Sequence, residues 1–273
     1  MAETDRVPAG VDPSVPSVAR MYDYYLGGRD HFPADRVAAE KMIELGRRMG
    51  NDARQIARAN RAFLGRAVRT IAESGVRQFI DIGAGLPTQD NVHQVARRHV
   101  HGSRVVYVDN DPVVLAHARA LLAREPDVVA LAGDLRDPDA ILDDPLVARH
   151  LDLSEPYAVL MVAVLHFVPD DAEAAAITAA IRARFRPGCH LVLSHLYAGD
   201  ATDDETEAGR QVYASTTAGG LARRGLGQIS GYFTDLELLG PGVVPVADWA
   251  ADAPKDGTYD LVRPGILGGV GRA

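Results

Sequence analysis

A glycine-rich loop, Asp81-Ile-Gly-Ala-Gly85, directly follows an apolar run at residues 78–82. Glycines let the backbone turn tightly and approach a ligand more closely than a Cβ would permit. The third glycine of the dinucleotide pattern G-x-G-x-x-G would fall at Thr88, and the chain contains no G-x-x-x-x-G-K-[ST] string. The loop therefore indicates a ligand other than a dinucleotide or a nucleoside triphosphate, the alternative being a bare strand-to-helix turn.

Carboxylates follow the next two apolar runs. Asp109 ends the run at residues 104–109, and an acid at the end of a second strand can accept hydrogen bonds from both ribose hydroxyls of an adenosine ligand. Asp111 competes for this role, but its position directly before a proline favours capping of the next helix. Asp134 follows the third run, where it could accept from the exocyclic amine of adenine or cap a helix. Together with the glycine loop, these acids predict an adenosine-binding site.

A histidine follows the fourth apolar run, where residues 157–162 continue into Ala163-Val-Leu-His166. In a doubly wound sheet, ligands bind beyond the carboxyl ends of the strands at which the strand order reverses. His166 is therefore expected near a reacting centre, either as a general base or as a hydrogen-bonded structural group.

Two other strings that contain histidine are not expected to form a functional site. His99-Val-His101 lacks a third ligand at a suitable spacing, so no metal site is expected. Ser194-His195 is not a hydrolase pair, because neighbours on a strand point to opposite faces and no G-x-S-x-G string is present.

The segment at residues 20–31 combines three tyrosines and two adjacent glycines with an arginine and a histidine. Aromatic faces suit an adenine or a cation, and glycines allow close approach to a ligand. Arg20 could pair with a carboxylate of the ligand, and Gly27 could let the chain pass near it. Tyr22 and His31 could take part in proton transfer. We therefore predict that this segment is a lid over the ligand, the alternative being an amphipathic helix that packs only for stability.

The hydrophobic pattern of the chain predicts alternating strands and helices, which would position these residues. Continuous β-branched runs, typical of strands buried on both faces of a parallel sheet, lie at residues 78–82, 104–109, 128–131, 157–162 and 190–194. Helical spacing between the runs indicates a doubly wound α/β fold. Residues 236–246 and 259–270 are expected to close the sheet as a hairpin with one antiparallel strand, which makes a mostly parallel sheet of seven strands.

Apolar residues at helical spacing predict two helices before the first strand and one after the fifth, at residues 35–49, 52–74 and 203–224. Asp35 and Asp52 are expected to cap the first two helices. We therefore predict an extended leader at residues 1–16 within an N-terminal helical extension or lid at 1–74. A ligand-binding domain at 75–273 is expected to form one compact unit.

Six strings carry a family resemblance: Ala19-Arg-Met-Tyr-Asp-Tyr-Tyr-Leu-Gly-Gly28, Gln78-Phe-Ile-Asp-Ile-Gly-Ala-Gly-Leu-Pro-Thr88, Asn91-Val-His93, Val106-Tyr-Val-Asp-Asn-Asp-Pro112, Asp134-Leu-Arg-Asp-Pro138 and Val164-Leu-His-Phe-Val168. Over about residues 75–200 the chain resembles class I methyltransferases, which have a Rossmann-like fold. Over nearly its whole length it resembles a bacterial S-adenosyl methyltransferase family that was formerly a domain of unknown function. The resemblance implies the cofactor S-adenosyl-L-methionine. We expect contacts to it from Arg20, Tyr22, Gly27, Asp81, Gly83, Ala84, Gly85, Asp109, Asn110, Asp134, Leu135 and Ala163.

The resemblance also implies methyl transfer from S-adenosylmethionine to an acceptor that it does not identify, and we expect a small molecule. For a hydroxyl acceptor His166 is the expected general base, with Tyr22 and His31 as further candidates. A non-catalytic protein that binds or senses S-adenosylmethionine, without an enclosed acceptor pocket, is the alternative. The D/N-P-P-Y/F motif of many amino-group methyltransferases is missing after the fourth strand, which disfavours acceptors of that kind.

Composition restricts the partners. The 273 residues are 47% hydrophobic and 24% charged, the balance of a globular protein with a full core. A net charge of −8 disfavours broad contact with a nucleic-acid backbone. The lone Cys189 forms no intrachain disulfide and suggests a reducing cytoplasm. The longest apolar run, residues 157–168, falls short of the about 20 residues of a membrane helix, so no membrane association is expected.

Overall fold

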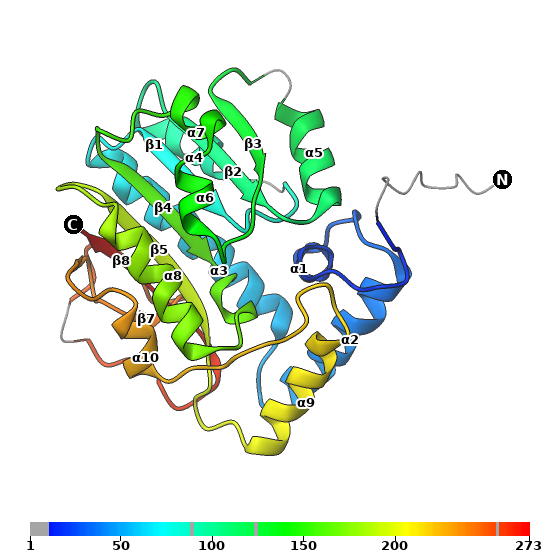
Figure 1. Cartoon of the computed structure of the whole chain (residues 1–273). Helices are drawn as coiled ribbons and strands as arrows, with labels where there is room; N and C mark the ends of the chain where they lie inside the picture. The colour runs from blue at the N-terminus through cyan, green and yellow to red at the C-terminus, as the bar shows by residue number, and fades with distance from the viewer. Residues whose placement is uncertain (1–10, 88–89, 123–124, 255–256) are drawn as a thin grey trace.

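The computed structural model describes residues 11–87, 90–122, 125–254 and 257–273. Within them, the centre of the molecule is an eight-stranded sheet of order β3-β2-β1-β4-β5-β8-β6, with β7 paired to β8 (Figure 1). The strands are β1 (Gln78–Ile82), β2 (Arg104–Asp109), β3 (Val128–Ala132), β4 (Tyr157–Val162), β5 (His190–Tyr197), β6 (Glu237–Leu238), β7 (Val244–Pro245) and β8 (Gly265–Arg272).

The first five strands are parallel, and β8 runs antiparallel to β5 at the position where the parallel part ends. The strand order reverses between β1 and β4, which are neighbours in the sheet although other elements separate them in the chain. This confirms the predicted doubly wound, mostly parallel fold. The carboxyl ends of β1, β2, β3 and β4 therefore meet at one edge of the sheet, where such folds bind ligands.

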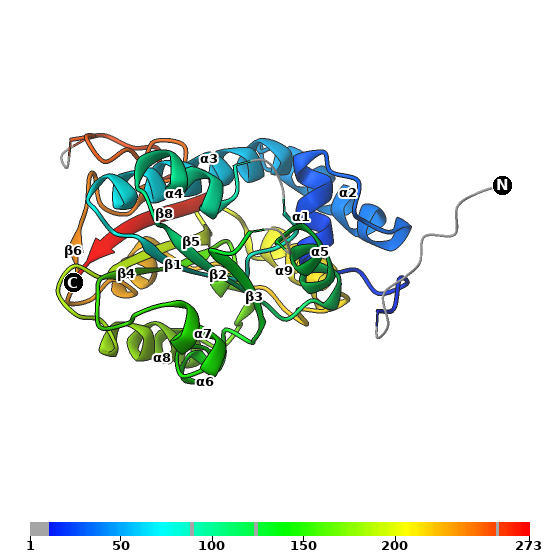
Figure 2. The ribbon, with the colours of Figure 1, turned by 90° about the horizontal axis from the view of Figure 1, so that it is seen from above.

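Helices cover both faces of the sheet (Figure 2). On one face lie α3 (Ala53–Glu73) and α4 (Val92–His99), and on the other α6 (Pro138–Leu142), α7 (Pro145–His150) and α8 (Asp171–Ala183). Because side chains alternate along a strand, Phe79 packs in the cluster with α3 and α4, whereas Ile80 packs in the cluster with the helices of the opposite face. Burial on both faces explains why the strands are continuous apolar runs.

Three further helices complete the fold around the sheet edge and the C-terminal region. α5 (Pro112–Leu122) follows β2 and packs against β3, α9 (Asp203–Ala214) follows β5, and α10 (Leu226–Gly231) precedes β6. A short 3-10 helix, η1 (Leu165–Phe167), follows β4. No helix within the described ranges is both long enough and apolar enough to cross a membrane.

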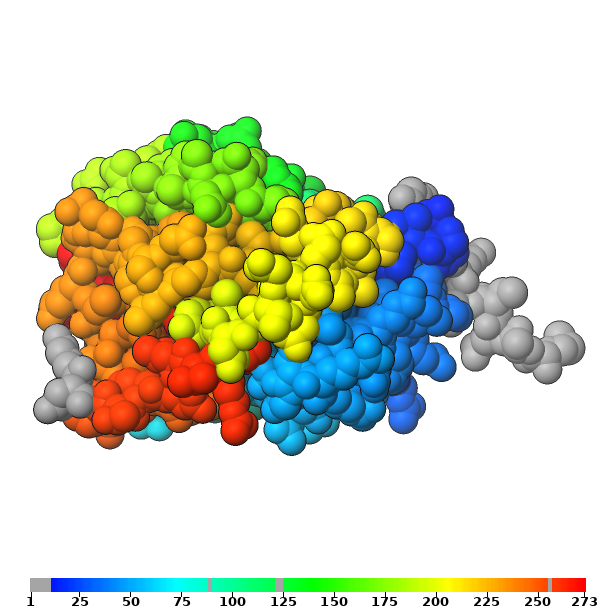
Figure 3. Space-filling model, turned by 90° about the horizontal axis from the view of Figure 1, so that it is seen from below, coloured from blue at the N-terminus to red at the C-terminus, as the bar shows by residue number. Residues whose placement is uncertain are grey.

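The N-terminal helices α1 (Val18–Leu26) and α2 (Pro33–Arg48) lie next to the carboxyl ends of the strands (Figure 1). α1 packs against α2 and α3, and α2 packs against α9. Met21, Ile43 and Tyr213 belong to the hydrophobic cluster that joins these helices. On the face shown in Figure 3, the yellow α9 region lies against the blue N-terminal helices. α3, in contrast, packs into the core of the sheet.

Several local expectations can be compared with the structure. Asp52 caps α3 as predicted, accepting from the Arg54 N–H at 2.8 Å. The cap predicted at Asp35 is wrong, because α2 already begins at Pro33. The Asp35 carboxylate is buried instead and accepts from the N–H groups of Ser17 and Phe32 at 2.8 and 2.7 Å.

Two C-terminal elements are shorter than expected. The helix predicted to Arg224 ends at Ala214, and the chain then turns so that the N–H of Thr217 donates to the carbonyl of Pro16 at 2.9 Å. The strand predicted at 236–246 is split into β6 and β7 by a turn in which Gly240 has a φ of 57°, which is why the sheet has eight strands. Thr88 and residues 1–10 of the predicted leader lie outside the described residues.

Candidate functional site

The glycine loop after β1 contains two residues in the left-handed region, Gly83 with a φ of 74° and Gly85 with a φ of 66°. The N–H groups of Gly83 and Ala84 donate to the carbonyl of Val108 at 2.8 and 3.2 Å, which holds the loop against the end of β2. A Cβ at Gly83 would lie 2.4 Å from Cγ2 of Val164, whereas a Cβ at Gly85 would meet nothing within 4 Å. Gly85 therefore borders open space that a ligand can enter.

Asp109 lies beside this loop with a largely buried carboxylate. Its Oδ2 accepts from the Gly85 N–H and its Oδ1 from the Asp111 N–H, each at 2.9 Å. Burial raises the pKa of Asp109 to about 6, although these backbone hydrogen bonds oppose the shift. Carboxylate oxygens accept more than one hydrogen bond each, so Asp109 retains capacity for two ligand hydroxyls.

Asp111 has a different role from Asp109. Its Oδ1 accepts from the Val113 N–H at 2.8 Å at the start of α5, and its Oδ2 accepts from the hydroxyl of Ser17. The acid closer to α5 thus holds the helix and the N-terminal segment together. Both acids line the pocket, but Asp109 accepts its two hydrogen bonds from backbone N–H groups, whereas Asp111 also binds the side chain of Ser17.

Asp81 is buried at the end of β1, where burial raises its pKa to about 7. The positive charge of Arg61 on α3 acts against this shift, and the charge of Asp109 adds to it. Nη2 of Arg61 also donates to Oδ1 of Asn91 at 2.9 Å, at the start of α4. The positively charged guanidinium of Arg61 therefore lies near the glycine loop.

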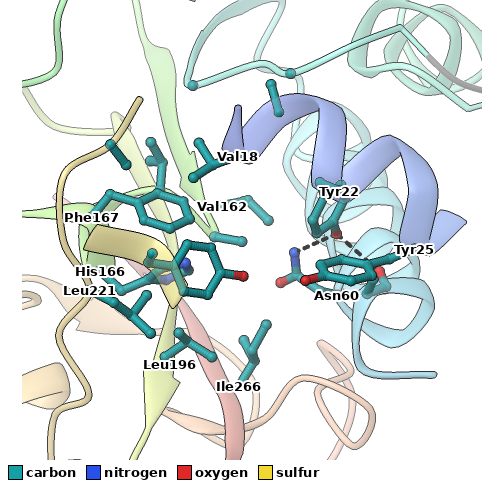
Figure 4. Close-up of a pocket in the computed structure, with 18 of the residues that line it drawn as sticks. Val18, Tyr22, Tyr25, Asn60, Val162, His166, Phe167, Leu196, Leu221 and Ile266 are labelled. Carbon is teal, nitrogen blue, oxygen red and sulfur yellow. Dashed lines mark hydrogen bonds between the residues drawn. The ribbon is translucent and has the colours of Figure 1, made fainter. Parts of the chain in front are cut away.

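One pocket joins these strand ends to the N-terminal helices. Ten of the predicted site residues line it: Tyr22, Asp81, Gly83, Ala84, Gly85, Asp109, Asn110, Leu135, Ala163 and His166. We call a second portion of the lining the apolar part, defined by Tyr25, Met42, Phe167, Leu196, Leu221 and Ile266. In Figure 4, the side chains from α1 and α3 face Phe167, Leu196 and Leu221 across the cavity.

His166 lies in η1 and is only 4% exposed. Its Nδ1 is buried and has no hydrogen-bond partner among the described residues. Burial, together with the nearby His195 and the positive charge of Arg224, lowers the pKa of His166 well below its usual range. His166 is therefore neutral at neutral pH, which is the form that can accept a proton.

Arg224 is the buried cation behind His166. Its Nη1 donates to Nε2 of His195 at 2.8 Å and its Nε donates to Asp171 at 2.9 Å. Nδ1 of His195 lies 2.7 Å from the carbonyl of Leu196, so the imidazole donates from Nδ1 and accepts at Nε2. This arrangement fixes the ring against which His166 packs edge to face, with centroids 5.5 Å apart.

Tyr22 begins a chain of hydrogen bonds along the pocket. Its hydroxyl donates to the carbonyl of Ala57 and accepts from Nδ2 of Asn60, both at 3.0 Å. Oδ1 of Asn60 accepts from Oγ of Ser194 at 2.7 Å, and that Oγ accepts from the Ala163 N–H at 2.9 Å. Ala163 has a φ of 57°, so the chain holds a strained backbone position at the pocket wall. The Tyr22 hydroxyl therefore donates to a backbone carbonyl at the pocket wall.

Four predicted site residues lie outside the lining of this pocket: Arg20, Gly27, His31 and Asp134. Nδ1 of His31 lies 3.1 Å from Oδ2 of Asp23, and Gly27 ends α1 with a φ of 84°. The carboxylate of Asp134 accepts from the Arg136 N–H at 2.9 Å. The paired glycines thus turn the chain away from the pocket, and the structure does not bring His31 to the cavity.

Arg20 is buried among acids. Its Nε lies 2.8 Å from Oδ2 of Asp35, its Nη1 lies 3.8 Å from Oδ2 of Asp111, and its Nη2 donates to the carbonyl of Val15 at 2.7 Å. The side chain is 2% exposed. Arg20 therefore ties α1 to α2 and to the start of α5, which places Tyr22 and Tyr25 over the strand ends.

The sequence analysis missed Asn60, Arg61, Tyr213 and Arg223, which also line the pocket. A signal existed for Asn60, because it is a polar residue at helical spacing on the apolar face of the predicted helix 52–74. No local pattern distinguishes Arg223, which lies in an irregular segment after α9.

The fold and the pocket define a class I methyltransferase dependent on S-adenosylmethionine. A family model described as S-adenosyl methyltransferase matches residues 4–273, and the chain belongs to that family. S-adenosylmethionine is accordingly its methyl donor.

Solved structures of similar proteins agree with this assignment. A candidate methyltransferase from Thermobifida fusca YX is 36% identical, with 98% of this chain and 99% of that chain covered and a TM-score of 0.86. A DUF574 family protein from Streptomyces avermitilis MA-4680 is 37% identical, with 96% and 98% covered and a TM-score of 0.84. A search of the curated proteins gives no match.

Proposed function

We propose that this methyltransferase acts on a small-molecule acceptor bound in the apolar part of the pocket. The observation that carries the proposal is that a single pocket is lined both by the loops at the strand ends and by the apolar part. Donor and acceptor can therefore share one cavity, which holds reacting atoms in line and raises their effective concentration. A non-catalytic binding protein has no need of this second portion of the lining.

The strand-end residues fit the chemistry of the cofactor. Asp109 has a buried carboxylate with remaining acceptor capacity for the ribose hydroxyls. We assign the cofactor's carboxylate to Arg61 instead of Arg20, because Arg61 lines the pocket beside Asp81 whereas Arg20 is buried against Asp35. Leu135 offers an apolar wall for adenine. The open space at Gly85 lets the cofactor approach the loop.

S-adenosylmethionine supplies an activated methyl group, whose bond to sulfur breaks with the electron pair retained by sulfur as the acceptor atom bonds to the methyl carbon. The protein aligns the two partners and excludes water. His166 is proposed to take the proton of a hydroxyl acceptor, which its position in the pocket lining and its neutral state support. The aliphatic and aromatic side chains of the apolar part leave few groups that could compete as nucleophiles.

The test uses S-adenosylmethionine labelled in its methyl group and a cell extract separated by size. We expect label to enter the small-molecule fraction and S-adenosylhomocysteine to form only when that fraction is present. Label entering only protein or nucleic acid would contradict the proposal.

Asp109→Ala is the matched control for that assay, since it should lose transfer along with cofactor binding. A wild-type protein that binds S-adenosylhomocysteine but releases none from S-adenosylmethionine with any fraction would support the non-catalytic alternative. Competition by a nicotinamide cofactor at the same site would contradict the cofactor assignment.

We further propose that the enzyme is bacterial and cytoplasmic and does not bind nucleic acid. The similar proteins from Thermobifida fusca and Streptomyces avermitilis support a bacterial source, the buried free thiol of Cys189 supports a reducing compartment, and the net charge of −8 disfavours nucleic acid. Residues 1–74 are proposed as an extension of the domain at 75–273. Within that extension α1 and α2 cover the pocket, whereas α3 supports the sheet.

A further inference from the structure

A row of rings runs from the candidate base His166 into the apolar part of the pocket. The His166 and Phe167 rings have centroids 4.4 Å apart, and the Phe167 and Tyr213 rings have centroids 5.5 Å apart. Leu196, Leu221 and Ile266 complete the wall, as Figure 4 shows around His166 and Phe167. The rings are inclined to one another, by 62° between His166 and Phe167 and by 48° between Phe167 and Tyr213. A planar ligand in this part of the pocket would therefore contact ring edges and faces together with the aliphatic side chains.

The pocket has polar groups at the Tyr213 end of the row of rings. The Tyr25 side chain is 6% exposed, and its hydroxyl is buried without a hydrogen-bond partner among the described residues. In Figure 4 this hydroxyl points toward the opposite wall of the pocket. Burial and the nearby phenol of Tyr213 raise the pKa of Tyr25 well above its usual range, so Tyr25 keeps its proton. The phenols of Tyr25 and Tyr213 interact with each other, so a ligand carboxylate would accept from the Tyr25 hydroxyl in place of Tyr213.

Arg223 lines the same pocket and lies near Tyr213. The backbone holds its position: the Ala222 N–H donates to the carbonyl of His166 at 2.8 Å, and the Arg224 N–H donates to the carbonyl of Leu196 at 3.2 Å. Alternate side chains of this segment point in different directions, so Arg223 lines the pocket whereas Arg224 reaches Asp171. These two hydrogen bonds, on either side of Arg223, hold its backbone next to His166 and Leu196.

The charge of Arg223 is poorly matched by the protein. Its Nη1 lies 3.7 Å from the thioether sulfur of Met49, and within the described part of the chain no ion pair joins it to a carboxylate. Glu205 favours its protonated form from nearby, but the Glu205 carboxylate accepts from the N–H and the hydroxyl of Thr202, both at 2.9 Å. Burial lowers the pKa of Arg223. A guanidinium in this setting is suited to a carboxylate brought by a ligand.

We propose that the methyl acceptor is a small aromatic carboxylate that carries a hydroxyl group. Its carboxylate binds Arg223 and the Tyr25 hydroxyl, its ring lies along Phe167 and Tyr213, and its hydroxyl faces His166. The hydroxyl oxygen forms the new bond to the methyl carbon, the electron pair of the broken bond stays on sulfur, and the proton passes to His166. This inference rests on the proposed methyl transfer to a small molecule.

The test is a binding experiment with the full chain saturated with S-adenosylhomocysteine. Calorimetry first establishes that the cofactor product binds, and failure at this step would contradict the proposed function before any acceptor is added. Hydroxybenzoate and hydroxycinnamate isomers are then titrated, each beside its neutral amide. We expect at least one acid to bind about tenfold or more tightly than its amide.

Three variants locate the binding group. Arg223→Met should abolish the preference for acid over amide, and Arg223→Lys should retain part of it, since both long side chains fill the same space but only lysine keeps the charge. Arg210→Gln removes an exposed arginine from the neighbouring α9 and should behave as the wild type. Cofactor binding should be unchanged in all three.

Three results would overturn the inference, and the first two can be read from the wild type alone. One is equal affinity for acids and amides. The second is no binding of any aromatic acid at about millimolar concentration to protein that holds S-adenosylhomocysteine. An unchanged acid preference in folded Arg223→Met protein would also overturn it.

Discussion

The carboxylate of Asp109 accepts a hydrogen bond from the backbone N–H of Gly85 at 2.9 Å, across the loops that end β1 and β2. The two residues are 24 positions apart in the chain. Their contact makes the glycine loop and the second acid one structure, because the same carboxylate also accepts from the Asp111 N–H. A change at Asp109 should therefore act on the cofactor through both its charge and the loop.

Replacement of Asp109 by alanine should weaken binding of S-adenosylhomocysteine at least about tenfold, since hydrogen bonds to a charged group contribute about 1.5–3 kcal/mol each. Calorimetry on folded protein measures this loss. Asp111→Ala is the matched control, and it should lower the melting temperature more than the affinity because Asp111 holds Val113 and Ser17. Loss of affinity in Asp111→Ala with retention in Asp109→Ala would show that the other acid binds ribose.

The affinity for S-adenosylhomocysteine should depend on pH through Asp109. Burial raises its pKa from 3.8 to about 6, so the stability that this group contributes to the free protein is complete below pH 3.8 and is lost as pH rises through about 6. Cofactor binding, in contrast, needs the ionised carboxylate of Asp109, so the affinity rises as pH rises through about 6. Affinity should be maximal above about pH 6 and fall by up to about tenfold per pH unit below it.

Titrations at a series of pH values between about 5 and 8 test this dependence. Asp109→Asn, which cannot ionise, should bind more weakly and lose this component of the pH dependence. An unaltered profile in that variant would assign the titration to another group, with Asp81 and its pKa of about 7 as the first to examine.

Replacement of His166 by alanine should lower kcat about 100-fold or more if it acts as the general base, while the affinity for S-adenosylhomocysteine changes little. Because the pKa of His166 lies well below its usual range, wild-type kcat should show no acidic limb near pH 6.5. His101→Ala, in an exposed loop, is the control. Equal turnover by His166→Ala and wild type would make His166 a structural residue.

Replacement of Arg20 by methionine should lower the free energy of unfolding by about 3–5 kcal/mol, since it leaves Asp35 buried without its cation. Urea unfolding measures this change. Arg48→Met removes the exposed partner of Glu44 on α2 and should cost about 1 kcal/mol or less. A stable Arg20→Met protein that has lost affinity for the cofactor would instead support the original assignment of Arg20 to the cofactor.

The strand-end part of the site could be predicted because its residues are set by local pattern. A buried parallel strand requires a continuous apolar run, and the residue that follows it must lie at the carboxyl edge of the sheet. This reasoning predicts that Asp81, Gly85, Asp109 and His166 share one pocket, and the structure brings them together.

The helical side of the site depended on packing between distant segments. Arg20 and Arg61 are both arginines on helices, yet Arg20 is buried against Asp35 and Asp111, and Arg61 lines the pocket. No local pattern separates these outcomes, because the partners lie far away in the chain.

By itself, the sequence determined the doubly wound sheet, the glycine loop and the acid at the end of β2, since strand periodicity and glycine conformation are local properties. Only the tertiary structure decided that α1 covers the strand ends, that His31 turns toward Asp23, and that Arg223 faces the pocket while its neighbour Arg224 does not. The direction of a side chain on a helix or in an irregular segment follows from which partners can bury it or neutralise its charge. Those partners are known only when the chain is packed.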